Sequence, residues 1–145
     1  MSNFEKINNI ALIEARFYSD IADELANGAK NIAENNGFLT RRIEVPGVFE
    51  IPAALNKIWN SGSISGVVAL GCVIRGETDH YDHICREVSR ALMDLSVNHG
   101  IPMGFGVITC ENYEQAKVRS SIKERDIGGR ATLACIEMIR IMDDS

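Results

Sequence analysis

The chain has 145 residues, of which 46% are hydrophobic, and a formal net charge of -5 at pH 7. This length suits one domain with a single core. The acidic balance argues against general nucleic-acid binding, which depends on clustered Lys and Arg. The sequence shows neither a signal-peptide core nor an apolar run of membrane-spanning length. We therefore expect one domain over residues 1–145, located in the cytoplasm, with no nucleic-acid or membrane partner.

The four cysteines provide a second constraint. They form no C-x-x-C pair, and each lies in or beside an apolar segment: Cys72, Cys85, Cys110 and Cys135. This pattern favours reduced thiols in the core over structural disulfides. Reduced thiols agree with a cytoplasmic location.

The first half of the chain predicts strands that alternate with helices. Residues 10–13 form a short apolar run typical of a strand. A helix follows with Ser19 at its N-cap, and its apolar residues recur at helical spacing at Ile21, Leu25, Ala29 and Ile32. Asn-Asn-Gly at residues 35–37 ends this helix. Residues 39–45 alternate as a strand does, and a second helix is predicted over residues 51–59.

The second half continues the alternation. Residues 67–74 form a continuous apolar run, typical of a central parallel strand covered on both faces. The helix after this strand has one apolar stripe, formed by Ile84, Val88, Ala91, Leu92 and Leu95. A strand over residues 103–108, a helix over residues 112–119 and a polar connection over residues 123–129 follow. The last helix has its apolar stripe at Ala131, Cys135, Met138, Ile139 and Met142.

This order of elements predicts right-handed crossovers and a parallel sheet. We expect a flavodoxin-like three-layer α/β sandwich, in which helices flank a four-stranded parallel sheet on both faces. In such folds ligands bind in the crevice outside the carboxyl ends of the strands. The residues that follow the strand at 67–74 are therefore the first candidates for chemistry.

His80 follows that strand and lies one helical turn before Ile84 on the apolar stripe. If Thr78 or Asp79 caps the helix, the first turn offers unpaired backbone N–H groups to a phosphate or carboxylate. His80 is then either an acid–base group or a capping residue, and the spacing leaves both interpretations open. His83 lies on the polar side of the helix and is predicted to be a surface residue.

Several motifs identify a family. They are A-R-F at residues 15–17, V-P-G-V-F-E-I-P at 45–52, G-C-V-I-R-G-E-T-D-H-Y-D at 71–82 and F-G-V-I-T at 105–109. E-Q-A at residues 114–116, Arg119 and I-E-M at 136–138 extend the match. Through these motifs the chain resembles the 6,7-dimethyl-8-ribityllumazine synthase family of riboflavin biosynthesis. The match spans nearly the whole chain in order, and the block at 71–82 is highly specific.

The resemblance implies condensation of 5-amino-6-(D-ribitylamino)uracil with 3,4-dihydroxy-2-butanone 4-phosphate, releasing phosphate and water without a metal or organic cofactor. Amine attack, loss of phosphate and ring closure move protons several times, and histidine suits this near neutral pH. His80 matches the family's catalytic histidine. The turn that includes Glu77 and Thr78 would bind phosphate through backbone N–H groups. Arg119 would complete the phosphate site from the neighbouring subunit.

The resemblance also assigns the remaining substrate contacts. Phe17 matches the aromatic residue that stacks on the pyrimidine, although a buried core phenylalanine is the alternative. Phe105 would reach the pyrimidine from the neighbouring subunit. The turn that would bind the ribityl chain and the ring consists of Val48, Phe49 and Glu50. The strand end whose backbone would contact the substrates consists of Cys72, Val73 and Ile74. Glu50 would accept hydroxyl hydrogens, or is simply a first-turn helix residue.

Three positions depart from the family pattern. Tyr18 stands where many members have Asn, and Val48 replaces a more common Ala, which predicts altered contacts to the ring or the ribityl chain. Residues 126–128 are Asp-Ile-Gly where many members have Asn-Lys-Gly. A lysine near the phosphate is therefore missing, and Lys123 and Arg125 are both candidates to replace it.

By resemblance the protein partner is a second copy of this chain, in a pentamer around a five-fold axis or in a shell of twelve pentamers. Three other interpretations remain: an archaeal-type riboflavin synthase, a non-catalytic carrier of the same fold, and a metal-binding module. The metal module would use Asp79, His80, Asp82 and His83. These neighbours point around too much of a helix to converge on one ion.

Overall fold

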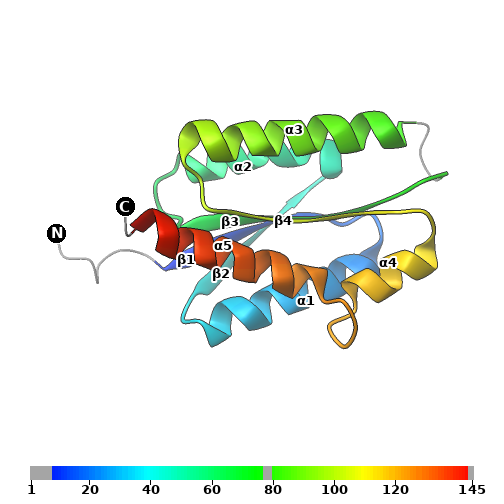
Figure 1. Cartoon of the computed structure of the whole chain (residues 1–145), viewed down its shortest axis with the longest axis horizontal. Coiled ribbons are helices and arrows are strands. Elements are labelled where there is room, and N and C mark those ends of the chain that lie inside the picture. The colour runs from blue at the N-terminus through cyan, green and yellow to red at the C-terminus, as the bar shows by residue number, and fades with distance from the viewer. Residues whose placement is uncertain (1–7, 77–79, 144–145) are drawn as a thin grey trace.

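Four parallel strands form one sheet in the order β2-β1-β3-β4 (Figure 1). The computed structural model describes residues 8–76 and 80–143. The strands are β1 (Asn9–Ala15), β2 (Leu39–Val45), β3 (Gly66–Ile74) and β4 (Met103–Cys110). Because all four strands run in the same direction, their carboxyl ends meet at one edge of the sheet.

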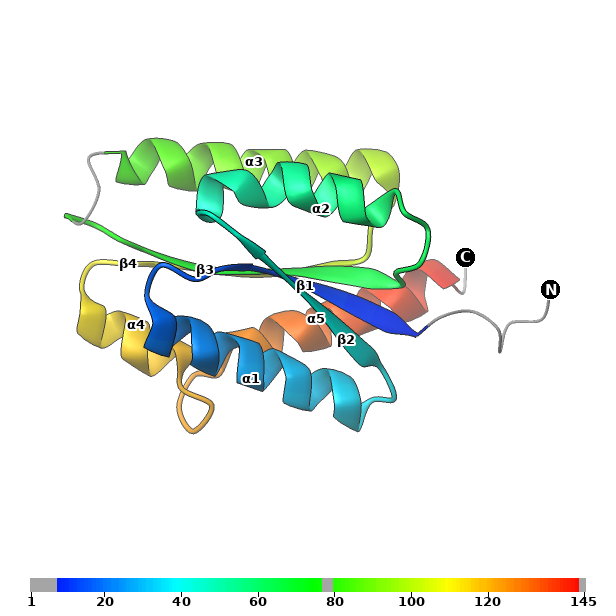
Figure 2. The ribbon, with the colours of Figure 1, turned by 180° about the vertical axis from the view of Figure 1, so that it is seen from behind.

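Helices cover both faces of the sheet, as the two opposite views show (Figures 1 and 2). One face carries α1 (Ser19–Asn35), α4 (Tyr113–Ser120) and α5 (Ile127–Asp143). The other carries α2 (Ile51–Trp59), which a short 3-10 turn (Val48–Glu50) precedes, and α3 (Tyr81–His99). The predicted flavodoxin-like three-layer fold is confirmed. No helix in the described ranges is both long and apolar enough to cross a membrane.

The inner strand β1 contributes to two cores because alternate side chains of a strand point to opposite faces. Ile10 and Leu12 pack with α1 and α5 on one side. Ala11 and Ile13 pack with α2 and α3 on the other side. All four residues are fully buried. The strand is therefore apolar along nearly its whole length, as expected for a central strand of a parallel sheet.

We call the side covered by α1, α4 and α5 the closed face. Helix α5 packs tightly on it and buries Gly128, Gly129, Ala131, Thr132, Cys135, Ile136 and Ile139. Glycines permit this close approach. A Cβ atom at Gly104 of β4 would lie 2.0 Å from the carbonyl oxygen of Ala131, and one at Gly128 would lie 2.1 Å from that of Leu25.

We call the side covered by α2 and α3 the open face. Helix α3 has 19 residues, but only Val88 and Leu92 are buried. Met93 and Val97 on the same helix are 63% and 69% exposed. The single chain therefore leaves much apolar surface of this helix uncovered.

The predicted elements are confirmed, with differences at their ends. The N-cap of α1 is Tyr18, and Ser19, which was expected to cap the helix, is its first residue. The connection predicted to reach residue 129 ends at Asp126, whose Oδ1 accepts a hydrogen bond from the Gly129 N–H at 3.1 Å. Two consecutive glycines disfavour a helix locally, but here Gly128 lets α5 approach α1 and Gly129 leaves room for the Asp126 side chain.

Helix α3 begins at Tyr81, one residue after His80, which was expected to lie inside the helix. Its N-cap is His80, so His80 precedes the helix and does not lie on the stripe. The proposed caps Thr78 and Asp79 lie outside the described residues. In the last helix, Ala131, Cys135 and Ile139 are buried as predicted, whereas Met138 and Met142 are only half-buried.

Candidate active site

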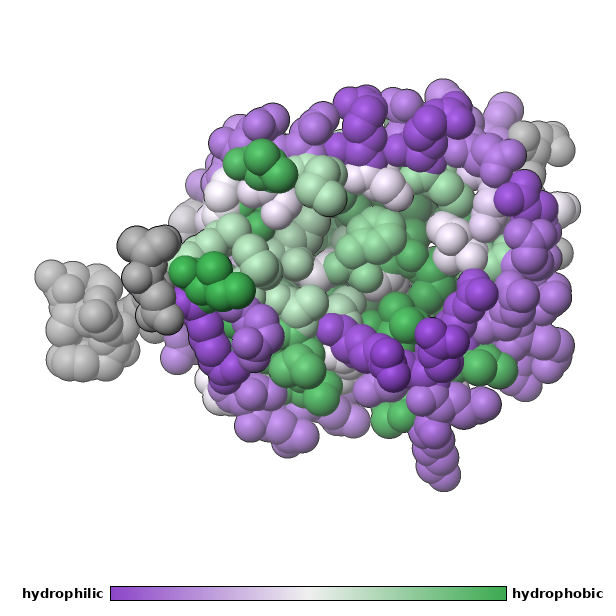
Figure 3. All heavy atoms as spheres, in the orientation of Figure 1, coloured by the Kyte–Doolittle hydropathy of each residue, from purple (hydrophilic) through white to green (hydrophobic). Residues whose placement is uncertain are grey.

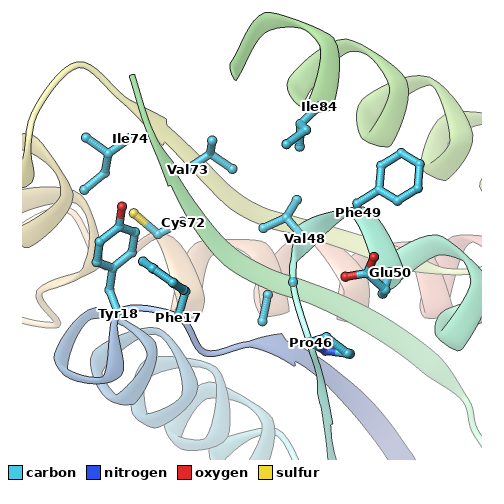
Figure 4. Close-up of a pocket in the computed structure, with 12 residues that line it drawn as sticks. Phe17, Tyr18, Pro46, Val48, Phe49, Glu50, Cys72, Val73, Ile74 and Ile84 are labelled. Carbon is cyan, nitrogen blue, oxygen red and sulfur yellow. The ribbon is translucent and has the colours of Figure 1, made fainter. Parts of the chain in front are cut away.

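A cavity of about 370 Å³ opens at the carboxyl ends of β1 and β3, beside the turn that joins β2 to α2 (Figure 4). This size suits a small organic ligand. The predicted residues that line it are Phe17, Val48, Phe49, Glu50, Cys72, Val73 and Ile74. Three segments that are far apart in the sequence thus meet at one hollow, at the edge where the fold predicts ligand binding.

Phe17 follows β1 and contributes one wall of the cavity. Its side chain is 80% exposed, which excludes the alternative of a buried core phenylalanine. The Phe17 and Tyr18 rings meet edge to face, with centroids 4.9 Å apart and planes at 84°. Figure 4 shows these rings side by side, near Cys72 and Ile74. Tyr18 also lines the cavity, although the sequence indicated it only as a departure from the family pattern.

A buried carboxylate fixes the turn that carries Phe17. Glu14 is only 3% exposed and accepts hydrogen bonds from Arg42 on β2 at 2.6 and 2.9 Å and from Arg16 at 2.9 Å. Arg16 also pairs with Asp23 of α1. Sequence reasoning missed Glu14, and the signal was a single acidic residue within the apolar run of β1. A buried charge of this kind requires the partners it has here.

The 3-10 turn provides the opposite wall. Val48 is buried, whereas Phe49 and Glu50 are exposed and reach the cavity. A Cβ atom at Gly71 of β3 would lie 2.8 Å from Cγ2 of Val48, so glycine lets the turn pack against the strand. Ile84 of α3, which the sequence placed only on an apolar stripe, also lines the cavity.

Two thiols connect the floor of the cavity to Arg119. Cys72 lines the cavity and donates a hydrogen bond to Cys110 on β4, which lowers the pKa of Cys110 to about 7. The same contact, together with burial, raises the pKa of Cys72. Nη1 of Arg119 donates to the sulfur of Cys110 at 3.6 Å and to the carbonyl of Thr109 at 2.8 Å. Arg119 favours the Cys110 thiolate as well.

His80 does not line this cavity. It is exposed at the N-cap of α3, where its carbonyl accepts a hydrogen bond from the Ile84 N–H at 2.8 Å. His83 is also exposed, as predicted for a surface residue. The predicted phosphate-binding residues Glu77 and Thr78 lie outside the described residues.

Phe105 and Arg119 also lie apart from the cavity. Phe105 is on the edge strand β4, 46% exposed, and lines a second cavity of about 320 Å³ with Leu92, Met93 and Met103 of the open face. Arg119 lines a third cavity on α4, together with Arg125. Lys123 does not line the third cavity. One chain therefore gathers the predicted pyrimidine and ribityl residues but not Phe105 or Arg119.

A layer of apolar surface surrounds Phe105. Figure 3 shows a hollow with apolar residues between the polar outer sides of α3 and α5, where β4 runs in Figure 1.

No three His, Cys, Asp or Glu side chains in residues 8–76 and 80–143 are grouped so that they could hold a metal ion.

Arg75 connects the end of β3 to the start of α3. Its N–H donates to the Cys110 carbonyl at 2.8 Å, which extends the pairing with β4. Its guanidinium lies over the Tyr81 ring, 4.2 Å from the centroid. It also forms ion pairs with Asp82 at 3.3 Å and with Glu111 at 3.1 Å. The sequence includes Arg75 in a family motif, but its partners became visible only in the structure.

Comparison with known proteins supports the interpretation of these motifs. The model of the 6,7-dimethyl-8-ribityllumazine synthase family matches residues 8–143. A protein of that name from Agrobacterium fabrum is 47% identical over 138 residues, covering 92% of this chain and 93% of the relative. Its namesakes from Methylorubrum populi and Desulfovibrio desulfuricans are 45% and 38% identical over 137 residues, covering 91% and 92% of this chain and 81% and 88% of the relatives. The chain therefore belongs to the 6,7-dimethyl-8-ribityllumazine synthase family.

Proposed function

We propose that the cavity at the ends of β1 and β3 is the active site of a 6,7-dimethyl-8-ribityllumazine synthase. The reaction condenses 5-amino-6-(D-ribitylamino)uracil with 3,4-dihydroxy-2-butanone 4-phosphate and releases phosphate and water. The observation that carries this assignment is the meeting of Phe17, the turn Val48–Glu50 and the strand end at residues 72–74 around one cavity. The proposed reaction, as the resemblance implies, needs neither a metal nor an organic cofactor.

The ring of Phe17 is available to stack on the pyrimidine, because its side chain is 80% exposed. The Glu50 carboxylate reaches the same cavity from the opposite wall and can accept hydrogen bonds from ribityl hydroxyl groups. The backbone at Cys72, Val73 and Ile74 lies between these walls and supplies polar groups to the ring. The pyrimidine substrate would thus be bound by side chains at its faces and by backbone at its edge.

His80 is proposed as the acid–base residue. It is exposed at the N-cap of α3, so it does not pack in the core. Amine attack and ring closure both require proton transfer near neutral pH, for which histidine is suited. Glu77 and Thr78 stay predicted contacts of the phosphate.

Arg119 and Phe105 are proposed to act in the site of a neighbouring copy. In one chain they line cavities separate from the one that holds Phe17. The apolar hollow around Phe105 is suited to being covered by a second copy. We propose a pentamer, and a shell of twelve pentamers as the larger alternative. The free thiols favour the cytoplasm as its location.

Formation of the lumazine from the two purified substrates, followed by absorbance, tests this function. We expect His80→Ala to lower turnover about 10²- to 10⁴-fold, the typical contribution of a positioned acid–base group. His83→Ala, a change of the same residue type three positions away, should leave turnover unchanged. Absence of product from the intact protein, or equal turnover of His80→Ala and the wild type, would overturn the assignment.

A further inference from the structure

We propose that Arg75 is a positioning residue that acts through His80 by fixing the first turn of α3. This inference rests on the proposed function, because it takes His80 as the acid–base residue. Arg75 itself does not line the cavity that holds Phe17. Its contacts are instead with the residues that directly follow His80.

The contacts of Arg75 come from two sides. The backbone of Arg75 is bound to β4 through the Cys110 carbonyl at 2.8 Å, so it is anchored to the sheet. The side chain extends to α3, where the guanidinium lies 4.2 Å from the centre of the Tyr81 ring and 3.3 Å from a carboxylate oxygen of Asp82. Tyr81 and Asp82 are the first two residues of the helix. Arg75 therefore joins the start of α3 to the sheet.

A third partner restricts the guanidinium further. Glu111, which directly follows β4, accepts from Nε of Arg75 at 3.1 Å with both carboxylate oxygens. The planar guanidinium thus has an aromatic face on one side and carboxylates at its edge. This geometry suits arginine, whereas lysine has neither the planar face nor the fork of donors.

The start of α3 is only partly buried, because Tyr81, Ile84 and Cys85 pack against the core without being fully buried. Its buried residues, Val88 and Leu92, lie two turns or more from its start. His80 is the N-cap residue, directly before Tyr81 and Asp82, and its carbonyl accepts a hydrogen bond from the Ile84 N–H at 2.8 Å. The position of the His80 backbone therefore depends on that of the first turn of α3. Misplacement of a catalytic group by about 1 Å can cost up to 10²-fold in rate, so this anchor affects the reaction.

Steady-state kinetics of Arg75→Gln tests the proposal. We expect kcat to fall about tenfold, while KM for each substrate stays within about twofold, because Arg75 orients the acid–base residue and does not bind substrate. Arg90→Gln is the matched control. Arg90 is an exposed arginine of the same helix with ion pairs to Glu87 and Asp94, and its loss should not change kcat.

The ring of Tyr81 offers a second test. Tyr81→Phe keeps an aromatic face under the guanidinium and should keep wild-type kcat. Tyr81→Leu removes that face and should lower kcat in the same direction as Arg75→Gln. Arg75→Lys should recover only part of the lost rate, because it keeps the charge and loses the planar contact.

A double-mutant cycle distinguishes positioning from a general structural role. In protein that already carries His80→Ala, Arg75→Gln should have no further effect, because the residue through which it acts is absent. A further tenfold fall in the double variant, a raised KM for the ketone phosphate, or unchanged kcat in Arg75→Gln would overturn the inference. Failure of the proposed function is recognised separately, since it would leave the wild type inactive or His80→Ala unimpaired.

Discussion

The helices on the two faces of the sheet are buried to different degrees within one chain. On the closed face, α5 buries seven of its residues and meets backbone directly at Gly104 and Gly128. On the open face, the longer helix α3 buries only Val88 and Leu92. Phe105 and Met93 remain exposed beside a cavity between α3 and β4. Both faces have a buried core, but α3 on the open face is buried less than α5 on the closed face.

This difference bears on function because Phe105, one of the predicted site residues, lies on the open face. The turn with Phe17 is fixed inside one chain by the buried Glu14 and its arginines. Phe105 and Arg119, by contrast, lie on surfaces away from that cavity. We propose that contact with a second copy explains both the uncovered open face and the distance of Phe105 and Arg119 from the cavity.

The largest expected effect is on the closed face. In Gly104→Ala the new methyl group would lie 2.0 Å from the Ala131 carbonyl oxygen, so α5 would have to move away from the sheet. We expect a loss of about 3 kcal/mol or more in the free energy of unfolding, measured by urea denaturation. Gly62→Ala is the control, because its positive φ of 80° costs only about 1 to 2 kcal/mol and no atom lies within 4 Å. Equal losses in the two variants would contradict the close packing of α5.

On the open face we expect a substitution to change the stability of the folded chain less than on the closed face, but to disrupt the assembly of copies. Phe105→Asp places a charge in the apolar hollow that a second copy is proposed to cover. We expect light scattering to show a fall in molar mass, while circular dichroism shows a folded chain, because Phe105 is already 46% exposed. Asn27→Asp on the outer side of α1 should leave the mass unchanged. A Phe105→Asp protein of wild-type mass would place the contact between copies elsewhere.

The smallest expected effect concerns pH at the thiols. Because the pKa of Cys110 is lowered from the usual 9 to about 7, its contribution to stability is present above pH 9 and is lost as the pH falls through 7. The free energy of unfolding should therefore rise between pH 7 and 9, and Cys110→Ser should flatten this rise. Thiolate absorbance should titrate near pH 7 in the wild type and at higher pH in Cys72→Ala, which lacks the hydrogen-bond donor. Identical titrations in these two proteins would contradict the assigned hydrogen bond.

Much of the fold could be predicted from the sequence because its signals are local. The apolar run that became β3 and the Gly100 that ends α3 in the left-handed region are properties of short segments. Element ends were less predictable. The first turn of α5 contains two glycines, which disfavour a helix locally, and only the contacts with Leu25 and Asp126 explain why the helix includes them.

The site was predictable where a motif marked it and unpredictable where it depends on contacts between distant segments. The residues at 48–50 and 72–74 belong to motifs and do meet at one cavity. The pairing of Glu14 with Arg42 joins residues 28 positions apart, and the pairing of Arg75 with Glu111 joins residues 36 positions apart. Spacing along the chain contains no signal for such pairs.

The central claim, that two copies complete each active site, is tested most directly by mixing two inactive variants. His80→Ala and Arg119→Ala chains would be co-expressed with different tags, and assemblies containing both would be purified and assayed for lumazine formation. If His80 of one copy works with Arg119 of its neighbour, we expect recovery of about one quarter of the wild-type activity in randomly mixed rings, because that fraction of interfaces has both residues intact. If both residues act within one chain, no site is intact, and activity no higher than that of the separate variants would contradict the account.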